Sequence, residues 1–225
     1  MSSLSVIVPV LDEAAGIVAT LESLAPLRSR GAELIVVDGG SRDATVARAQ
    51  ALADRVIDGP RGRARQMNAG AAVARAPTLL FLHADTRLPE AADGLIAQAL
   101  GVAPLAWGRF DVTIDGRSRM LSVVAAMMNL RSRLTGIATG DQAMFMTRAA
   151  FDAVGGFPDQ PLMEDIEMSK RLRTLSRPAC LRERVITSGR RWEARGVWPT
   201  IVLMWRLRWA YWRGASPQVL ARRYE

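Results

Sequence analysis

The sequence predicts an α/β fold with a doubly wound, mostly parallel mixed sheet and helices on both faces. Strand and helix patterns alternate through the first hundred residues. The candidate strands are short, continuous apolar runs, as expected for strands that are covered on both faces. Turns that carry acidic residues follow these strands. This alternation is typical of βαβ units that share one sheet.

The first half of the chain supplies four candidate strands, each followed by a helix. The strands lie at residues 5–10, 33–38, 55–58 and 78–82. The first helix carries Ile17, Leu21 and Leu24 at positions i, i+4 and i+7, which places them on one face. Further helices are predicted at 44–52, 62–74 and 89–100.

The second half has a different rhythm. Strands are predicted at 107–114 and 142–147, with a helix rich in Met and Leu at 119–134 between them. A loop and a helix occupy 161–177, and a further helix occupies 198–212. The chain has no repeat, low-complexity tract or linker, so we predict one domain that spans residues 1–225.

Composition restricts the function classes. The net charge of +8 favours anionic partners such as phosphates, nucleic acid or a membrane surface. A single cysteine and a single histidine exclude an internal disulfide and a His-rich zinc centre. The chain has no apolar run long enough to span a bilayer, and its first residues lack a basic region before the first strand. We therefore predict a cytoplasmic protein.

Acidic residues follow the ends of the candidate strands, where ligands bind in doubly wound sheets. These residues are Asp12, Glu13, Asp38, Asp58 and Asp85, together with His83. Helix N-capping is the alternative explanation for acids after strands, and it accounts for Asp43. Asp38 precedes two glycines, which favours a ligand that approaches the backbone closely.

The segment GPRGRARQMNAG, residues 59–70, begins a helix. Free N–H groups at a helix start, with arginines beside them, favour an anion such as pyrophosphate. An exposed basic loop explains the segment equally well. Neither G-x-G-x-x-G nor G-x-x-x-x-G-K-[ST] occurs in the chain, which disfavours a dehydrogenase or a P-loop NTPase.

Five segments together resemble the successive motifs of family 2 glycosyltransferases. They are SVIVPVLDE (5–13), LIVVDGGSRD (34–43), RARQMNAG (63–70), LFLHADT (80–86) and MEDIEMSKRL (163–172). The resemblance covers most of the chain in the family's order, and it implies a GT-A fold that binds a nucleotide-sugar. Finer wording, such as MNLRSRLTG and TGDQAMF, is similar to a bacterial subgroup associated with arsenosugar biosynthesis.

The resemblance implies which residues bind the nucleotide, with Asp38 contacting uracil or ribose and Asp85 holding Mg²⁺ or Mn²⁺. The implied nucleotide-binding residues are Pro9, Val10, Glu13, Asp38, Gly39, Ser41, Arg63, Arg65, Asn68, Ala84 and Asp85. His83 replaces the first Asp of the family's D-x-D motif. It is a candidate metal ligand, a candidate ribose or phosphate contact, or a packed residue at a strand end.

Asp165 shares a helix face with the apolar residues Met168 and Leu172. An acid at this inward edge is either a helix cap or a positioned functional group. The resemblance makes Asp165, beside Glu164, the general base that activates an acceptor hydroxyl, with inversion at the anomeric carbon.

Four further residues are predicted to line the donor and acceptor pocket: Asp141, Gln142, Arg191 and Trp192. Arg191 and Trp192 resemble the end of the Q-x-x-R-W motif of processive relatives, but Ser188 stands where that motif has Gln. We therefore expect a non-processive enzyme.

The change of rhythm near residue 105 divides the domain into two halves, which we assign as a nucleotide-sugar-binding half (1–104) and an acceptor-binding half (105–196), followed by C-terminal amphipathic helices (197–225). A nucleotidyltransferase is one alternative, but it requires a catalytic lysine near the start, and Lys170 is the only lysine. A basic nucleic-acid-binding module is the other; it requires aromatics among exposed basic residues, whereas the basic, tryptophan-rich C-terminal helix is amphipathic. We expect no nucleic-acid partner.

A tryptophan stripe marks this helix. Its members occur at i, i+4, i+7, i+11 and i+14: Trp198, Val202, Trp205, Trp209 and Trp212. Our first interpretation is that the stripe packs on the domain or on a second copy in a homodimer. The alternative is a peripheral helix that lies in the inner face of the membrane.

Overall fold

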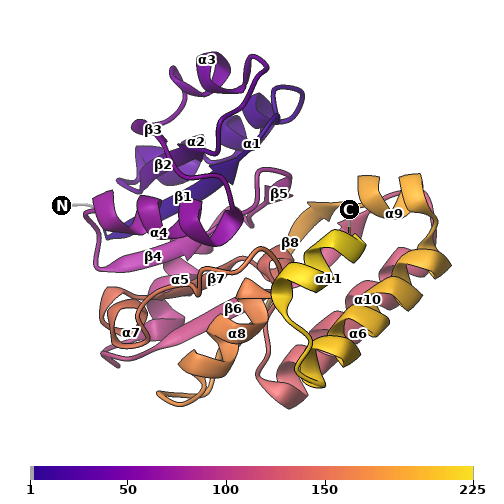
Figure 1. Ribbon diagram of the computed structural model, residues 1–225. Coiled ribbons are helices and arrows are strands. Elements are labelled where there is room, and N and C mark those ends of the chain that lie inside the picture. The colour runs from indigo at the N-terminus through magenta and orange to yellow at the C-terminus, as the bar shows by residue number, and fades with distance from the viewer. Residues whose placement is uncertain (1–2, 225) are drawn as a thin grey trace.

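Eight strands form one mixed sheet in the computed structural model, which describes residues 3–224 (Figure 1). The strands are β1 Leu4–Val10, β2 Glu33–Asp38, β3 Arg55–Asp58, β4 Thr78–Phe81, β5 Thr86–Arg87, β6 Trp107–Asp115, β7 Met144–Thr147 and β8 Ala179–Ser188. Their order in the sheet is β3-β2-β1-β4-β7-β6-β8-β5. Met1, Ser2 and Glu225, the ends of the predicted domain, lie outside the described residues.

The predicted fold class is confirmed by the pairing of these strands. β3, β2, β1 and β4 are mutually parallel, and β6 is parallel to β8. β7 runs antiparallel to both β4 and β6, and β5 runs antiparallel to β8. β7 therefore joins the parallel N-terminal half to the second half within one continuous sheet.

Helices cover both faces of the sheet (Figure 1). They are α1 Ile17–Ser23, α2 Ala25–Ser29, α3 Thr45–Ala49, α4 Arg63–Val73, α5 Ala92–Leu100, α6 Met120–Thr135, α7 Arg148–Ala153, α8 Glu164–Leu172, α9 Arg190–Arg195, α10 Val197–Trp212 and α11 Pro217–Tyr224. A short 3₁₀ turn, η1 Gly140–Gln142, precedes β7.

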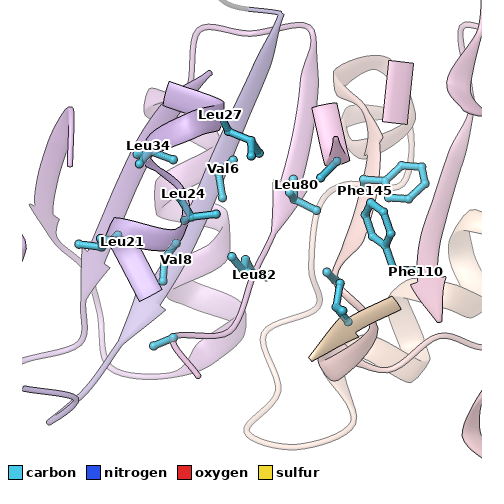
Figure 2. Packing of buried hydrophobic residues seen from close by; sticks show 14 of the residues in the cluster. Val6, Val8, Leu21, Leu24, Leu27, Leu34, Leu80, Leu82, Phe110 and Phe145 are labelled. Atoms are coloured by element: carbon cyan, nitrogen blue, oxygen red, sulfur yellow. The ribbon is translucent and has the colours of Figure 1, made fainter. Parts of the chain in front are cut away.

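Alternate strand residues enter two separate cores, because successive side chains of a strand point to opposite faces. Val6, Val8 and Leu34 pack with α1, α2, α5 and α6 in one core. Figure 2 shows Val6, Val8 and Leu34 of this core together with Leu21 and Leu24. Ile7 and Val37 pack with α4, α7 and α8 in the other. Covering both faces explains why the strands have continuous apolar sequences.

Two strands were not predicted. β8, ten residues long, contains the exposed run Arg182, Glu183 and Arg184, and β6 has a register shift beside it between Phe110 and Asp111. β8 is bordered on its outer side only by the two-residue β5. The charged run is tolerated because this edge faces solvent, and it hides the apolar pattern that normally indicates a strand.

The tryptophan stripe of α10 does not pack on the domain, so that part of our first interpretation is wrong. Trp198, Trp205 and Trp212 are 65%, 71% and 79% exposed. The inward face of α10 is formed by residues such as Leu203 and Leu207, which pack with α8 and α11. Within residues 3–224, the helices are too short or too polar to cross a membrane.

Candidate active site

The turn after β2 is built by Asp38. Its side chain is buried, and its carboxylate accepts hydrogen bonds from the backbone N–H groups of Gly40 and Ser41, both at 2.9 Å, and from the Ser41 hydroxyl. Gly40 has a φ of +93°, which favours glycine whether or not a ligand approaches. Asp38 thus shapes this turn, and its predicted nucleoside contact would come in addition to that role.

The loops after β1 and β2 hold each other in place. The Asp12 N–H donates to Ser41 Oγ at 2.9 Å, and the Arg42 N–H donates to Asp12 Oδ1 at 2.7 Å. The Glu13 N–H donates to Thr45 Oγ1 at 2.8 Å. The backbone beside Pro9, Val10, Gly39 and Ser41 is therefore organised by contacts within the chain.

Gln66 is a site-supporting residue that sequence reasoning missed. Its side-chain amide is buried and donates to the carbonyl oxygens of Val10 and Val37, both at 2.8 Å. A Cβ on Gly39 would lie 3.0 Å from this amide. Gln66 thus ties together the carboxyl ends of β1 and β2. The available signal was its position four residues before Gly70, on the helix face that meets the sheet.

Arg65 and Asn68 hold a later loop rather than facing the strand ends. The Arg65 guanidinium binds the Asp159 carboxylate through two nitrogens, at 2.7 and 3.0 Å. The Asn68 side chain donates to the Phe157 carbonyl at 2.8 Å and accepts from the Phe157 N–H at 2.9 Å. Both side chains already have partners, so their predicted direct contact with the nucleotide competes with these bonds.

Arg63 is the helix-start arginine that faces the acids. Its guanidinium lies 3.5 Å from a carboxylate oxygen of Glu164, the first residue of α8. Burial raises the pKa of Glu164, the charge of Asp165 raises it further, and Arg63 opposes both effects. For Arg63, burial acts to lower the pKa, but the surrounding carboxylates raise it. The predicted Glu164–Asp165 pair is thus brought next to α4.

Asp165 is held in one orientation by backbone donors. Its carboxylate accepts from the Gly140 N–H at 2.9 Å and from the Ile166 N–H at 2.7 Å. Burial raises the pKa of Asp165; these two N–H groups oppose the rise. His83, Glu164 and Asp165 line part of a cavity of about 10 Å³, which is close to the volume needed to hold one water molecule.

His83 contacts Asp141 through one ring nitrogen, and the other side of its ring packs against Gly140. Its Nδ1 lies 3.2 Å from Asp141 Oδ1, and a Cβ placed on Gly140 would lie only 2.3 Å from its Nε2. Burial acts to raise the pKa of Asp141, but the hydrogen bond from His83, helped by Arg63 and Arg191, lowers it. Of the three roles open for His83, these contacts fit a packed residue paired with Asp141.

Gln142 supports the turn before β7. Its side chain is completely buried, with Oε1 3.2 Å from the Thr139 N–H and Nε2 3.3 Å from Asn129 Oδ1. Ala84 is also buried, and its carbonyl accepts a hydrogen bond from the Thr20 hydroxyl. These two predicted site residues lie behind the surface that a substrate would contact.

Arg190 reaches the candidate metal residue, although we singled out only its neighbours. Its guanidinium lies 3.2 Å from Glu13 Oε2 and 3.7 Å from Asp85 Oδ2. Arg191 lies over the ring of Tyr224 at 4.8 Å, and burial lowers its pKa. Trp192 packs partly buried against the core. The start of α9 thus brings a cation to Asp85.

Asp85 is the carboxylate available to a divalent metal at this site. Within residues 3–224, three or more His, Cys, Asp or Glu side chains do not converge on one point. Asp85 is one-third exposed and offers one carboxylate. Mg²⁺ commonly takes one or two carboxylates together with substrate phosphates and water. The residues therefore fit a metal that is held jointly by Asp85 and a diphosphate.

A second hollow, of about 660 Å³, lies at the opposite edge of the sheet. It is lined by the first residues of β1 and β4, Leu4 and Thr78. One of its two acids, Asp93, is paired with Arg30 at 2.7 Å. The carboxyl edge, where the acids and arginines converge, remains the candidate active site.

Comparison with known families agrees with this placement. The sequence model described as Glycosyl transferase family 2 matches residues 5–154, two thirds of the chain. The chain belongs to glycosyl transferase family 2. The matched region includes β1, β2, α4, Asp85 and Asp141, but it ends before Glu164 and Asp165. The family assignment therefore establishes a glycosyltransferase.

A curated relative is also a glycosyltransferase. A "PGL/p-HBAD biosynthesis glycosyltransferase" of Mycobacterium bovis is 40% identical over 94 residues, which are 39% of this chain and 37% of that protein. The match thus spans little more than a third of the relative.

Two solved structures share the fold. The mannosyltransferase PcManGT from Pyrobaculum calidifontis, in complex with GDP-Man and Mn²⁺, has a TM-score of 0.65 at 22% identity, over 92% of this chain and 61% of that one. Glucosyl-3-phosphoglycerate synthase from Mycobacterium tuberculosis, with Mn²⁺ and UDP, has a TM-score of 0.60 at 19% identity, over 83% and 71% of the two chains. The fold is therefore GT-A, as expected.

Proposed function

We propose that this glycosyltransferase moves a sugar from a UDP-sugar to a hydroxyl acceptor, with inversion and with Asp165 as general base. The observation that carries the proposal is the placement of Asp165. Its carboxylate is oriented by the Gly140 and Ile166 N–H groups, it borders the cavity that His83 also lines, and the charge of Arg63 acts on it. The predicted base and the predicted nucleotide loops thus meet at one edge of the sheet.

Asp165 would take the proton while the acceptor oxygen bonds to the anomeric carbon. The bond from that carbon to the diphosphate breaks on the opposite face, which inverts the configuration. A raised pKa makes a carboxylate a stronger base, and a raised pKa is the direction found for Asp165. The two backbone donors keep the carboxylate oriented without a loss of side-chain entropy at the moment of reaction.

The leaving diphosphate would be stabilised by the cations around Asp85. Arg190 lies beside Asp85, and Arg63 and Arg191 interact electrostatically with it. A divalent ion held by Asp85 would supply further charge neutralisation on the diphosphate oxygens. Arginine binds phosphate oxygens through two nitrogens at once, so these side chains also fix the orientation of the donor.

The solved neighbours support the donor class. One was solved with GDP-Man and Mn²⁺ and the other with UDP and Mn²⁺, so this fold holds nucleoside diphosphates together with a divalent ion. We favour UDP because Asp38 matches the position that contacts uracil or ribose in the family resemblance. Family membership also decides against the nucleotidyltransferase and nucleic-acid-binding alternatives.

We propose one domain in which residues 1–104 bind the donor, 105–196 bind the acceptor and 197–225 form accessory helices. A cytoplasmic location, at the inner membrane face, and the likeness to the arsenosugar-associated subgroup stay predictions from the sequence. A homodimer also stays a prediction.

Two variants test the proposal together. A thermal-shift screen of UDP-, GDP- and dTDP-sugars with Mn²⁺ first identifies the donor. Asp165→Asn is then expected to keep UDP affinity by calorimetry and to lower turnover by about 10²- to 10⁴-fold. Asp85→Ala is expected to remove the dependence of turnover on Mn²⁺. Loss of UDP binding in Asp165→Asn would move this residue to the donor site, and unchanged metal dependence in Asp85→Ala would refute the metal assignment.

A further inference from the structure

Two helices of the second half expose apolar stripes with the same spacing. On α10 the stripe is Trp198, Val202, Trp205, Trp209 and Trp212, which are 65%, 51%, 71%, 60% and 79% exposed. On α6 it is Val123, Met127, Leu130 and Leu134, which are 51%, 57%, 51% and 77% exposed. Residues at i, i+4, i+7 and i+11 form one line along a helix. Most of the exposed large apolar side chains of the described chain belong to these two lines.

The two helices lie near each other, as the contacts at their ends indicate, and they overlap in the view of Figure 1. Near their starts, Val197 and Ile201 of α10 pack against the core that includes Leu121 and Val124 of α6. Near the end of α6, Ile137 packs with Leu207 of α10. α6 and α10 therefore run in the same direction as neighbours.

Both stripes lie on the solvent-exposed sides of their helices, away from the packed sides. On α10, Val197 and Ile201 pack against the core that includes residues of α6. Trp198 and Val202 each come one residue later, which places them about 100° further around the helix. On α6, the stripe lies opposite Ala125 and Asn129, which are buried towards the sheet. We call the two exposed lines together the α6–α10 face and define it by the nine exposed side chains named above.

The charges of this face have one sign. Residues 120–135 and 197–212 contain no Asp or Glu. Arg206 and Arg213 are exposed on the flank of the tryptophan stripe, and the Arg213 guanidinium lies over the Trp209 ring at 5.1 Å. Two copies that met through this face would bring arginines together with no acid from either helix to pair with them. An anionic lipid surface supplies both the missing negative charge and an apolar layer.

We infer that the α6–α10 face docks on the surface of an anionic lipid bilayer. Tryptophan and arginine suit the headgroup region because each combines an apolar body with a polar end. α10 lies along the surface in this arrangement rather than across the bilayer, since it is short and carries two arginines in its second half. Arg190 and Arg191 are the first residues of α9, which directly precedes α10 in the chain. Docking therefore places the candidate active site beside the membrane.

Vesicle binding tests the apolar part of the inference. The intact protein is mixed with phosphatidylcholine vesicles with or without phosphatidylglycerol, and the bound fraction is measured by flotation. We expect binding to the anionic vesicles and a loss of at least about tenfold in Trp205→Ser/Trp209→Ser, because docking strength scales with the apolar area buried. Val102→Ser/Leu105→Ser is the matched control, since it removes exposed apolar side chains away from the face.

A charge-matched pair tests the electrostatic part. Arg206→Gln/Arg213→Gln is expected to weaken binding to anionic vesicles by about 25-fold, or about fivefold for each arginine near the surface. Arg75→Gln/Arg177→Gln lowers the net charge equally at exposed positions off the face and is expected to stay close to the unmodified protein. Equal losses in the two pairs would reduce the effect to net charge and overturn the inference.

Sedimentation velocity separates the bilayer from a second copy of the chain. A dimer that becomes a monomer in Trp205→Ser/Trp209→Ser, with no vesicle binding by either protein, would assign the face to self-association and overturn the inference. UDP affinity and far-UV circular dichroism are expected to be unchanged in every variant. The outcome is therefore independent of the proposed transfer reaction.

Discussion

Gly140→Ala makes the contact between the turn before β7 and His83 measurable. Gly140 does not have the positive φ that favours glycine, so alanine suits the backbone. The added Cβ would lie 2.3 Å from Nε2 and 2.5 Å from Cε1 of His83, and real Cβ atoms do not approach so closely. The imidazole must move, and its 3.2 Å contact with Asp141 must lengthen.

The expected cost follows from these two changes. Loss of the His83–Asp141 hydrogen bond costs about 0.5–1.5 kcal/mol. An imidazole pushed away from its preferred rotamer costs about 0.5–1.5 kcal/mol more. Restriction of the unfolded chain by alanine offsets part of this cost, so Gly140→Ala should lower the free energy of unfolding by a net ~1 kcal/mol. In a His83→Ala background the space is vacant, and the same change should raise stability by about 0.4–1 kcal/mol, because alanine restricts the unfolded chain.

Urea unfolding of the four proteins in this double-mutant cycle measures the effect of Gly140→Ala with and without the imidazole. We expect opposite signs for Gly140→Ala in the two backgrounds, with unchanged m-values. If the cost is the same with and without the imidazole, His83 does not fill the space beside Gly140.

The acid limb of the pH profile of kcat/KM should lie above the pH at which an ordinary aspartate ionises, because burial raises the pKa of Asp165 and only its ionised form accepts a proton. Arg63→Gln removes a charge that lowers this pKa, so the limb should move to still higher pH; a shift to lower pH would contradict the assignment. Arg190→Gln should strengthen Mn²⁺ binding, measured by calorimetry without nucleotide, by up to about fivefold, since the exposed guanidinium competes with the metal beside Asp85. The same variant should weaken UDP binding. A Kd for Mn²⁺ equal to that of the control variant Arg42→Gln would argue against competition. Gln66→Leu should cost about 1–3 kcal/mol in urea unfolding, because it removes two buried hydrogen bonds, although the Val10 carbonyl keeps its bond from the Gly39 N–H; a cost below about 0.5 kcal/mol would mean that water replaces the amide.

Roles that depend on contacts distant in sequence could not be predicted. The RARQMNAG segment indicated a helix start near a phosphate, but Arg63 alone faces the acids, while Arg65 and Asn68 bind a loop some ninety residues later. Gln66 supports the ends of two strands, although nothing in the motif singles out this glutamine. Arg190 meets Glu13 across 177 positions of the chain, a separation at which spacing carries no information.

By itself the sequence determined the alternation of strands and helices, the carboxyl-edge location of the acids and the family motifs, because apolar periodicity and turn chemistry are local properties. It also determined that α10 carries a tryptophan stripe at helical spacing. Only the tertiary structure decided which side of α10 is inward, since both of its sides contain apolar residues, and packing against α8 and α11 selected Leu203 and Leu207 over the tryptophans. It likewise decided that β8, with a charged run at its centre, extends the sheet, because that strand's partners come from elsewhere in the chain.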